Sequence, residues 1–198
     1  MHHPFSFFVL MLYAVTYSGP FGYLKPWTAV RDGKTNSQQF LTPSTLEGLR
    51  RKLDVSAILR HKLTHQGVDW QQEMTHPRDW RVEDRGRRLS RPRAVLERGV
   101  LLAPTLVLGL ATDADAAWAA RQHVCLSRNE DLLLPTGPAQ ALTVAEFEAL
   151  PGFELWPAQE DDDEAFLVGH NRYEGNAPMY GRLAITGKLM APSLLPSG

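Results

Sequence analysis

The chain has 198 residues, of which 43% are hydrophobic and 22% are charged. This composition excludes a disordered or fibrous protein, and the length suits one large domain or two small ones. The single cysteine, Cys125, excludes an intramolecular disulfide and a zinc site built from several cysteines. One cysteine also fits a reducing compartment, so we expect a cytoplasmic protein.

The formal net charge of −1 hides an uneven distribution along the chain. Residues 1–98 contain 16 Lys or Arg and 9 Asp or Glu, whereas residues 99–198 contain 5 and 13. The first half therefore carries +7 and the second half −8. Such asymmetry indicates a surface that binds a polyanion, with mutual neutralisation of the two halves inside one fold as the alternative.

The apolar run from Phe5 to Val15 permits two interpretations. It resembles the core of a signal peptide, but no Lys or Arg precedes it and the residues after it make a poor cleavage site. The run is also too short to span a membrane as a helix. We favour a central β-strand, apolar on both faces, that ends at the turn Gly19–Pro20.

A loop or loose hairpin is expected over residues 21–39, because glycines and a proline punctuate them. The loop interleaves aromatic and basic residues: Tyr23, Lys25, Trp27, Arg31 and Lys34. Aromatic faces stack on unpaired bases while cations meet phosphates. The loop is therefore a candidate RNA-binding element, and an ordinary surface loop is the alternative.

Residues 40–53 predict the start of a helix. Thr42 or Ser44 can cap its first turn, Pro43 suits the first helical position, and Glu47 follows Ser44 at the capping-box spacing. One apolar stripe contains Leu46, Leu49 and Leu53. The residues off this stripe include Arg50, Arg51 and Lys52. We expect the helix to continue to about His61, with its cations either solvated or facing a polyanion.

Residues 68–98 have few aliphatic side chains and cannot bury much surface. Eight arginines occupy positions 78, 81, 85, 87, 88, 91, 93 and 98. We expect a projecting hairpin or arm, because long segments of this composition do not pack into a core. Arginine fits phosphate and stacks on bases, so the arm is a second candidate RNA-binding element. A solvated, salt-bridged loop is the alternative.

The second half of the chain alternates strands with short helices. A strand interrupted at Pro104, or two short strands, precedes a helix that Asp113 caps. A capping box at Thr143 opens a further short helix, and the acidic run 160–164 predicts a solvated loop. The order of elements fits a β-α-β-β-α-β, ferredoxin-like arrangement with the arm as an insertion.

The sequence lacks the glycine-rich phosphate loop, the dinucleotide fingerprint and the nucleophile elbow. His61 and His65 are four residues apart, but the glutamate of the zinc-protease motif is missing, so we expect no metal or cofactor. One catalytic alternative is metal-free RNA cleavage, which needs a base near the 2′-hydroxyl and a cation near the phosphate. The candidates for these roles are Tyr23, Lys25, His61, Lys62 and His65.

Three stretches together resemble the fifth CRISPR-associated (Cas) family, the RAMP subunits of Cascade-type effectors. The first is the apolar strand ending in Gly19–Pro20 with its aromatic and basic loop. The second, Pro-Ser-Thr-Leu-Glu-Gly-Leu at 43–49, looks like the family's Pro-Ser-Thr-Leu-x-Gly-Leu helix start. The third, residues 123–131 with Leu-Ser-Arg-Asn-Glu, is similar to a family stretch of the form Tyr-Leu-Gly-Arg-Ser-Glu after an alanine-rich helix. The family often has glycine where this chain has Ser127, and the residues after 135 match no feature of it.

The resemblance implies an α+β, ferredoxin-like (RRM-like) RAMP domain at 1–135, with an arginine-rich thumb at 68–98 and a small accessory segment at 136–198. It implies a non-catalytic subunit that binds the 5′ handle of the CRISPR RNA (crRNA) and caps the effector's backbone for RNA-guided DNA recognition. The implied partners are crRNA, the backbone RAMP subunits, the large subunit and, through the complex, target DNA, but no membrane. One branch of the family cleaves precursor RNA, which keeps the endoribonuclease alternative open.

Residue chemistry and resemblance together give a set of candidate RNA-binding residues and no catalytic residue. The set is Tyr23, Lys25, Trp27, Arg31, Lys34, Ser44, Thr45, Arg50, Arg51, Arg78, Arg81, Arg85, Arg87, Arg88 and Arg128.

Overall fold

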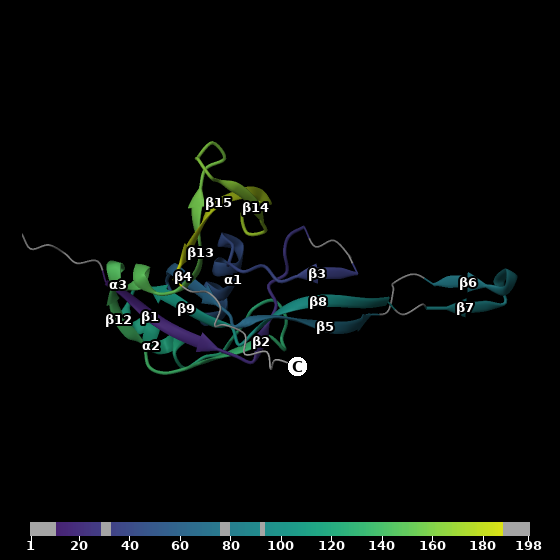
Figure 1. Cartoon of the computed structure of the whole chain (residues 1–198), viewed down its shortest axis with the longest axis horizontal. Helices are drawn as coiled ribbons and strands as arrows, with labels where there is room; N and C mark the ends of the chain where they lie inside the picture. The colour runs from purple at the N-terminus through teal and green to yellow at the C-terminus, as the bar shows by residue number, and fades with distance from the viewer. Residues whose placement is uncertain (1–10, 29–32, 76–79, 92–93, 188–198) are drawn as a thin grey trace, which may run out of the picture.

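The computed structural model describes residues 11–28, 33–75, 80–91 and 94–187 (Figure 1). Within these ranges the protein is a mixed α+β molecule whose strands pair mostly in antiparallel fashion. Arg31, Arg78 and the first six residues of the apolar run that we predicted as a strand lie outside the described residues. None of the described helices combines the length and the apolar content needed to cross a membrane.

The main sheet is built around β1, which pairs with β9 on one side and with β11 and β12 on the other. Its central strands are β1 (Met11–Ser18), β4 (Ile58–Thr64), β9 (Thr105–Leu110), β11 (Leu132–Pro135) and β12 (Gln140–Thr143). The short β10 (Val124–Cys125) pairs with β11 at the edge. The strand order β11-β1-β9-β4 is consistent with the expected β-α-β-β-α-β arrangement.

Helices cover both faces of this sheet. The helices are α1 (Pro43–Leu53), α2 (Asp113–Ala119) and α3 (Val144–Ala149). Helices α1 and α2 pack on one face over a core of fully buried residues such as Val15 and Leu108. Phe147 of α3 packs against Leu12 and Ala14. Because successive side chains of a strand point to opposite faces, Ala14 and Val15 of β1 serve the two different cores.

Helix α1 begins where the sequence predicted, but its capping box and its end differ from the expectation. Thr42 is the cap, because its hydroxyl oxygen accepts the backbone N–H of Thr45, and Pro43 follows it. The expected capping box between Ser44 and Glu47 is wrong, since Glu47 instead pairs with arginines of the same helix. The helix stops at Leu53, where Asp54 adopts the left-handed conformation with φ of 55°. The expected continuation to His61 is therefore also wrong, and β4 begins at residue 58.

A second sheet forms the projecting arm. Its strands are β2 (Phe21–Gly22), β3 (Lys34–Asn36), β5 (Gly67–Thr75) and β8 (Ala94–Leu102). Strands β5 and β8 pair along their whole length, and we call this hairpin the shaft. The tip comprises β6 (Arg81–Glu83), the 3-10 turn η1 (Asp84–Gly86) and β7 (Arg88–Ser90). Figure 1 shows the shaft and the tip extending away from the main sheet, as expected for an inserted arm.

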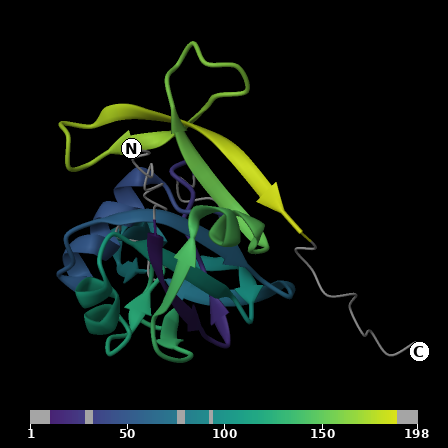
Figure 2. The same cartoon turned by 90° about the vertical axis from the view of Figure 1, so that its left-hand side faces the viewer.

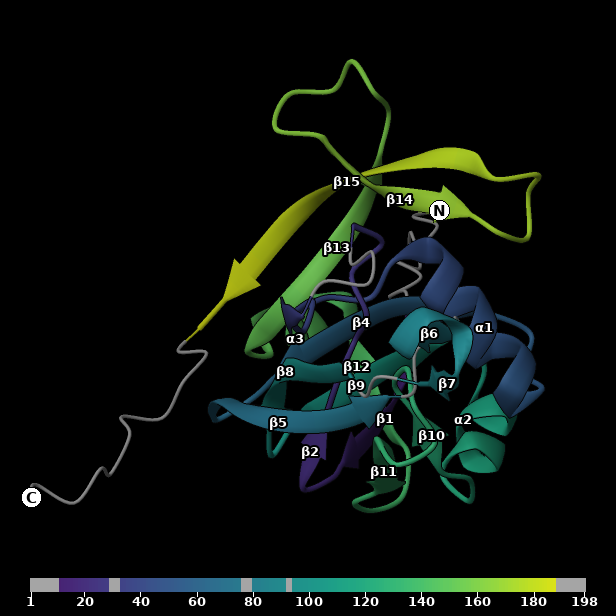
Figure 3. The ribbon, with the colours of Figure 1, turned by 90° about the vertical axis from the view of Figure 1, so that its right-hand side faces the viewer.

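The C-terminal hairpin layer comprises β13 (Gly152–Ala158), β14 (Phe166–Asn171) and β15 (Ala177–Thr186). Strand β13 joins the main sheet through one registered pair, Phe153 with Leu63 of β4, and then diverges from it. The layer stands above the main body beside α1 (Figure 2, Figure 3). The division into a domain ending at residue 135 and an accessory segment stays a prediction, although the strands after 135 join the main sheet.

Candidate nucleic-acid interface

A groove of about 560 Å³ runs between one face of α1, the loop after β2, the turn after β10 and the hairpin of β14 and β15. Five of the predicted residues line it: Lys25, Trp27, Ser44, Thr45 and Arg128. The charged side chains among its described lining residues are all basic, namely Lys25, Lys52, Arg128 and Arg172. The groove therefore presents a positive surface to which segments distant in the sequence contribute.

Trp27 provides an aromatic platform in the lining of the groove. Its side chain is 49% exposed, so a large part of the indole faces solvent. The ring of His170, in β14, meets the indole edge-on with 5.6 Å between the ring centres. This contact ties the loop after β2 to the C-terminal hairpin and leaves indole surface on which a base can stack.

Lys52 and Arg172 face the groove from opposite walls. Both are exposed, and neither forms an ion pair within the described part of the chain. The guanidinium of Arg172 lies 4.9 Å from the Tyr173 ring centre and donates a hydrogen bond to the Tyr173 hydroxyl. The hairpin approaches α1 closely at Gly48, where a Cβ atom would lie 3.1 Å from Nη2 of Arg172. A glycine in the helix therefore makes room for the second wall.

Two hydroxyl groups hold the loop after β2 in place. The backbone N–H of Leu24 donates to Oγ of Ser37 at 2.9 Å, and that of Lys25 donates to Oγ of Ser127 at 3.0 Å. Ser127 is the residue that stands where the resembling family often has glycine. Here its side chain connects the loop directly to the turn after β10.

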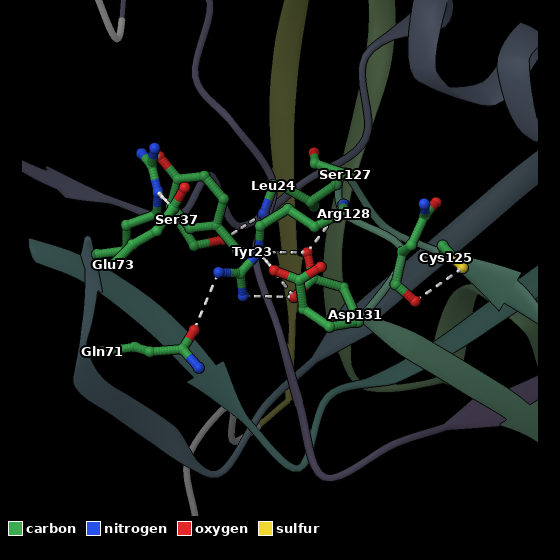
Figure 4. Close-up of polar contacts among 12 residues, drawn as sticks. Tyr23, Leu24, Ser37, Gln71, Glu73, Cys125, Ser127, Arg128 and Asp131 are labelled. Atoms are coloured by element: carbon green, nitrogen blue, oxygen red, sulfur yellow. Dashed lines mark hydrogen bonds and ion pairs between the residues drawn. The ribbon is translucent and has the colours of Figure 1, made fainter. Parts of the chain in front are cut away.

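Tyr23 and Arg128 are engaged inside the protein (Figure 4). Tyr23 is only 1% exposed, and its hydroxyl is 2.9 Å from Oγ1 of Thr35. Arg128 donates to the fully buried carboxylate of Asp131, with 2.6 Å between Nη2 and Oδ1, and to the side chain of Gln71 at 2.9 Å. The expectation that a base stacks on Tyr23 is not compatible with this burial.

Several other predicted cations also have partners within the protein. Lys34 lies 3.9 Å above the Trp70 ring and pairs with Glu97 at 3.7 Å. Arg50 and Arg51 both bind Glu47, and their hydrogen bonds lower the pKa of that carboxyl to about 2. Arg51 is nevertheless exposed, and the other exposed arginines of the predicted set that the structure describes lie on the tip: Arg81, Arg85, Arg87 and Arg88.

Sequence reasoning did not select Lys52, His170 or Arg172 as site residues. Lys52 lay in the noted basic run of the helix, but the sequence did not distinguish it from its two neighbours. Residues 170–173, His-Asn-Arg-Tyr, mix basic and aromatic types as the loop after β2 does. This mixture of basic and aromatic residues is the feature of the sequence that indicates a second wall of the groove.

The residues proposed for RNA cleavage do not meet at the surface. His61 and Lys62 lie on β4 and His65 directly follows it, so none of them is on a helix, and they are 1%, 2% and 5% exposed. Nε2 of His61 accepts backbone N–H groups, and Lys62 contacts Glu154 and Thr186. His65 stacks on Phe153. Among the described residues, no group of three or more His, Cys, Asp or Glu is arranged to hold a metal ion.

Comparison with known proteins shows a shared fold. No family model and no curated protein matches the sequence. A chain from a solved structure of a CRISPR RNA-guided surveillance complex is similar, with a TM-score of 0.52 and 13% sequence identity. The likeness covers 91% of this chain and 93% of that chain, so it extends over the main sheet, the arm and the C-terminal hairpin layer together.

Proposed function

We propose that the protein is a non-catalytic, RNA-binding subunit of a Cascade-type CRISPR effector, a RAMP protein of the fifth Cas family that binds the 5′ handle of crRNA. The observation that carries this proposal is the groove, which combines unpaired cations with a half-exposed indole and has no acidic residue in its described lining. The fold shared with a chain of a CRISPR RNA-guided surveillance complex supports the same role.

The groove suits unpaired nucleotides better than a duplex. Trp27 offers an indole face to one base, and Lys52 and Arg172 lie on facing walls to meet the phosphates on either side. Ser44 and Thr45 place the first turn of α1 at the groove, where the helix dipole adds positive potential. In this role the subunit caps the backbone, contacts the neighbouring RAMP protein and the large subunit, and reaches target DNA through them.

Binding of labelled repeat RNA that carries the 5′ handle, followed by fluorescence anisotropy across a salt series, tests the proposal. The double variant K52Q/R172Q removes two cations from the groove, so the slope of log K against log salt should fall by about 1.4. Arg121→Gln, an exposed cation that does not line the groove, is the matched control and should leave the slope unchanged. Absence of RNA binding at low salt, or an unchanged slope in K52Q/R172Q, would contradict the proposal.

The same incubation tests the absence of catalysis. Analysed on a denaturing gel, without metal and with Mg²⁺, the repeat RNA should be retained at full length. A defined cut by the wild-type protein would instead support the precursor-processing alternative.

A further inference from the structure

The shaft of the arm meets the groove at a cluster around Tyr23. Arg98 of β8 and Arg128 of the turn after β10 lie over this ring, with their guanidinium carbons 5.2 Å and 5.4 Å from its centre. Both guanidiniums also contact β5, the other strand of the shaft. The cluster is therefore the place where the shaft, the loop after β2 and the turn after β10 meet (Figure 4).

Arg128 bridges the two sides of this junction. Its Nε and Nη2 donate to Asp131, which is fully buried in the turn, while Nη1 donates to Oε1 of Gln71 on β5 at 2.9 Å. Glu130 lies 3.4 Å from Nε, so two carboxylates compensate the guanidinium. With only 16% of the side chain exposed, little of this cation is available to a phosphate.

Arg98 connects the two strands of the shaft to the same ring. Its Nε donates to Glu73 at 2.7 Å, which joins β8 to β5, and its Nη1 reaches Oγ1 of Thr35 at 3.3 Å. Thr35 belongs to β3, which pairs with β8, and its hydroxyl contacts that of Tyr23. The ring is thus held by side chains from the arm and from the core.

We propose that Arg128 is a positioning residue, which together with Tyr23 and Arg98 forms a latch that fixes the shaft at one angle to the groove. This inference rests on the proposed function and adds that the arginines of the tip bind the same RNA strand as the groove. Two binding sites held at a fixed geometry gain affinity because the second contact is intramolecular and pre-organised. The latch therefore contributes to RNA affinity without touching RNA.

Two substitutions separate this role from a direct phosphate contact. Arg128→Lys keeps the positive charge, but an ammonium cannot reproduce the planar fork that reaches Asp131 and Gln71 together. Gln71→Met removes only the acceptor on the shaft and leaves the pair between Arg128 and Asp131 intact. Gln71→Met should therefore fold even if Arg128→Lys does not, because the buried carboxylate of Asp131 keeps its partner Arg128.

The geometry of the latch can be measured without RNA. Spin labels at Gln72→Cys on the exposed side of β5 and at Arg121→Cys after α2, in a Cys125→Ser background, report the shaft-to-core distance by pulsed electron resonance. Both R128K and Q71M should broaden the distance distribution. A distribution that stays as narrow as that of the labelled parent in both variants would overturn the latch, whatever the protein does with RNA.

RNA binding then tests the consequence. Both variants should lower the affinity for the repeat RNA by about 10-fold, although neither removes a positive charge. Arg85→Gln on the tip is the matched control and should reduce the salt slope without altering the shaft-to-core distance. Wild-type affinity in R128K and Q71M would overturn the inference. Absence of RNA binding by the parent would refute the proposed function, while the distance measurement would still decide whether the latch exists.

Discussion

His61 connects the C-terminal hairpin layer to the core as a neutral imidazole. Its Nε2 accepts the backbone N–H groups of Leu41 and Leu155 at 3.4 Å and 3.3 Å, which requires the ring proton to be on Nδ1. Burial lowers the pKa of His61 to about 4; Glu154 opposes this shift, and Lys62 and Arg60 add to it. Protonation of the ring would place an N–H group at Nε2, facing the backbone N–H donors of Leu41 and Leu155 without accepting from them.

The stability of the protein should depend on pH through His61. The folded pKa of about 4 lies below the ordinary value of 6.5, so between these values the unfolded chain binds the proton more readily. The contribution of neutral His61 to the free energy of unfolding is complete above pH 6.5. It is lost as the pH falls toward 4, by up to about 3 kcal/mol. Urea unfolding at pH 7 and pH 4.5 measures it.

His61→Gln supplies an acceptor that does not titrate and should flatten this dependence. His123→Gln, at an exposed position, is the control and should keep the wild-type dependence. An equal loss of stability in wild type and H61Q between pH 7 and pH 4.5 would refute the assignment.

Glu154 is the buried partner of two cations on β4. It is 1% exposed and contacts Arg60 and Lys62, of which Lys62 is also buried. Burial alone would raise the pKa of Glu154, but the hydrogen bond and charge of Arg60 lower it overall. Glu154→Gln leaves Lys62 without its countercharge and should destabilise the protein by about 3 kcal/mol in urea titrations.

Arg60 offers an internal control for this prediction. Its second partner, Glu148, is 49% exposed, and an exposed pair contributes little. Glu148→Gln should therefore change the free energy of unfolding by less than about 1 kcal/mol. Similar losses in both variants would show that burial does not determine the effect.

At the residue scale, the sequence predicts which side chains have the chemistry to bind RNA. It does not predict which of them are exposed and free of partners within the protein. The loop after β2 was selected for its aromatic and basic residues, yet Trp27 is exposed and Tyr23 is buried in the latch. Arg128 was selected as a cation, but Asp131 three residues later compensates it. The partners of Tyr23 and Arg128 include residues of the arm that are far away in the sequence, and no local pattern indicates them.

At the scale of elements, local signals located the helices better than their ends. Pro43 and the leucine stripe predicted α1, and the capping box at Thr143 is confirmed in α3. The continuation past Leu53 failed because the short apolar run after Val55 fits a helix or a buried strand equally well. Pairing of β4 with β9 decides between them, and that contact is not local.

The start of α1 gives a prediction at this scale. Thr42→Ala removes the acceptor of the Thr45 N–H and should lower the free energy of unfolding by about 1 kcal/mol. Ser44→Ala should cost less, because the Ser44 hydroxyl has no hydrogen-bond partner among the described residues. Urea unfolding of the two variants measures the difference. A larger loss in S44A than in T42A would restore the capping box that the sequence suggested.

At the scale of the whole molecule, the order of elements was predictable and the assembly of the groove was not. The β-α-β-β-α-β order and the inserted arm follow from runs of apolar, helical and arginine-rich sequence. The second wall comes from residues 169–173, which follow the acidic run 160–164 in a half of the chain with net charge −8. The net negative charge of this half therefore gave no indication that His170 and Arg172 form a basic wall beside α1.

The arm allows the two basic regions to be separated experimentally. Thr75 and Ala94 are direct partners at the outer end of the shaft, so a two-residue Asn-Gly turn can replace residues 76–93 and close the hairpin. The described tip strands pair with each other and not with the main sheet, so the melting temperature should stay within a few degrees of the parent, by circular dichroism.

RNA binding by this shortened protein should fall because the tip carries four of the predicted phosphate contacts: Arg81, Arg85, Arg87 and Arg88. Loss of two or more contacts lowers the salt slope by at least about 1.4. A full-length variant with all seven arginines of residues 76–93 changed to glutamine is the matched control and separates charge from shape. If the shortened protein binds the repeat RNA with the parental slope, the groove alone holds the strand and the tip serves another partner.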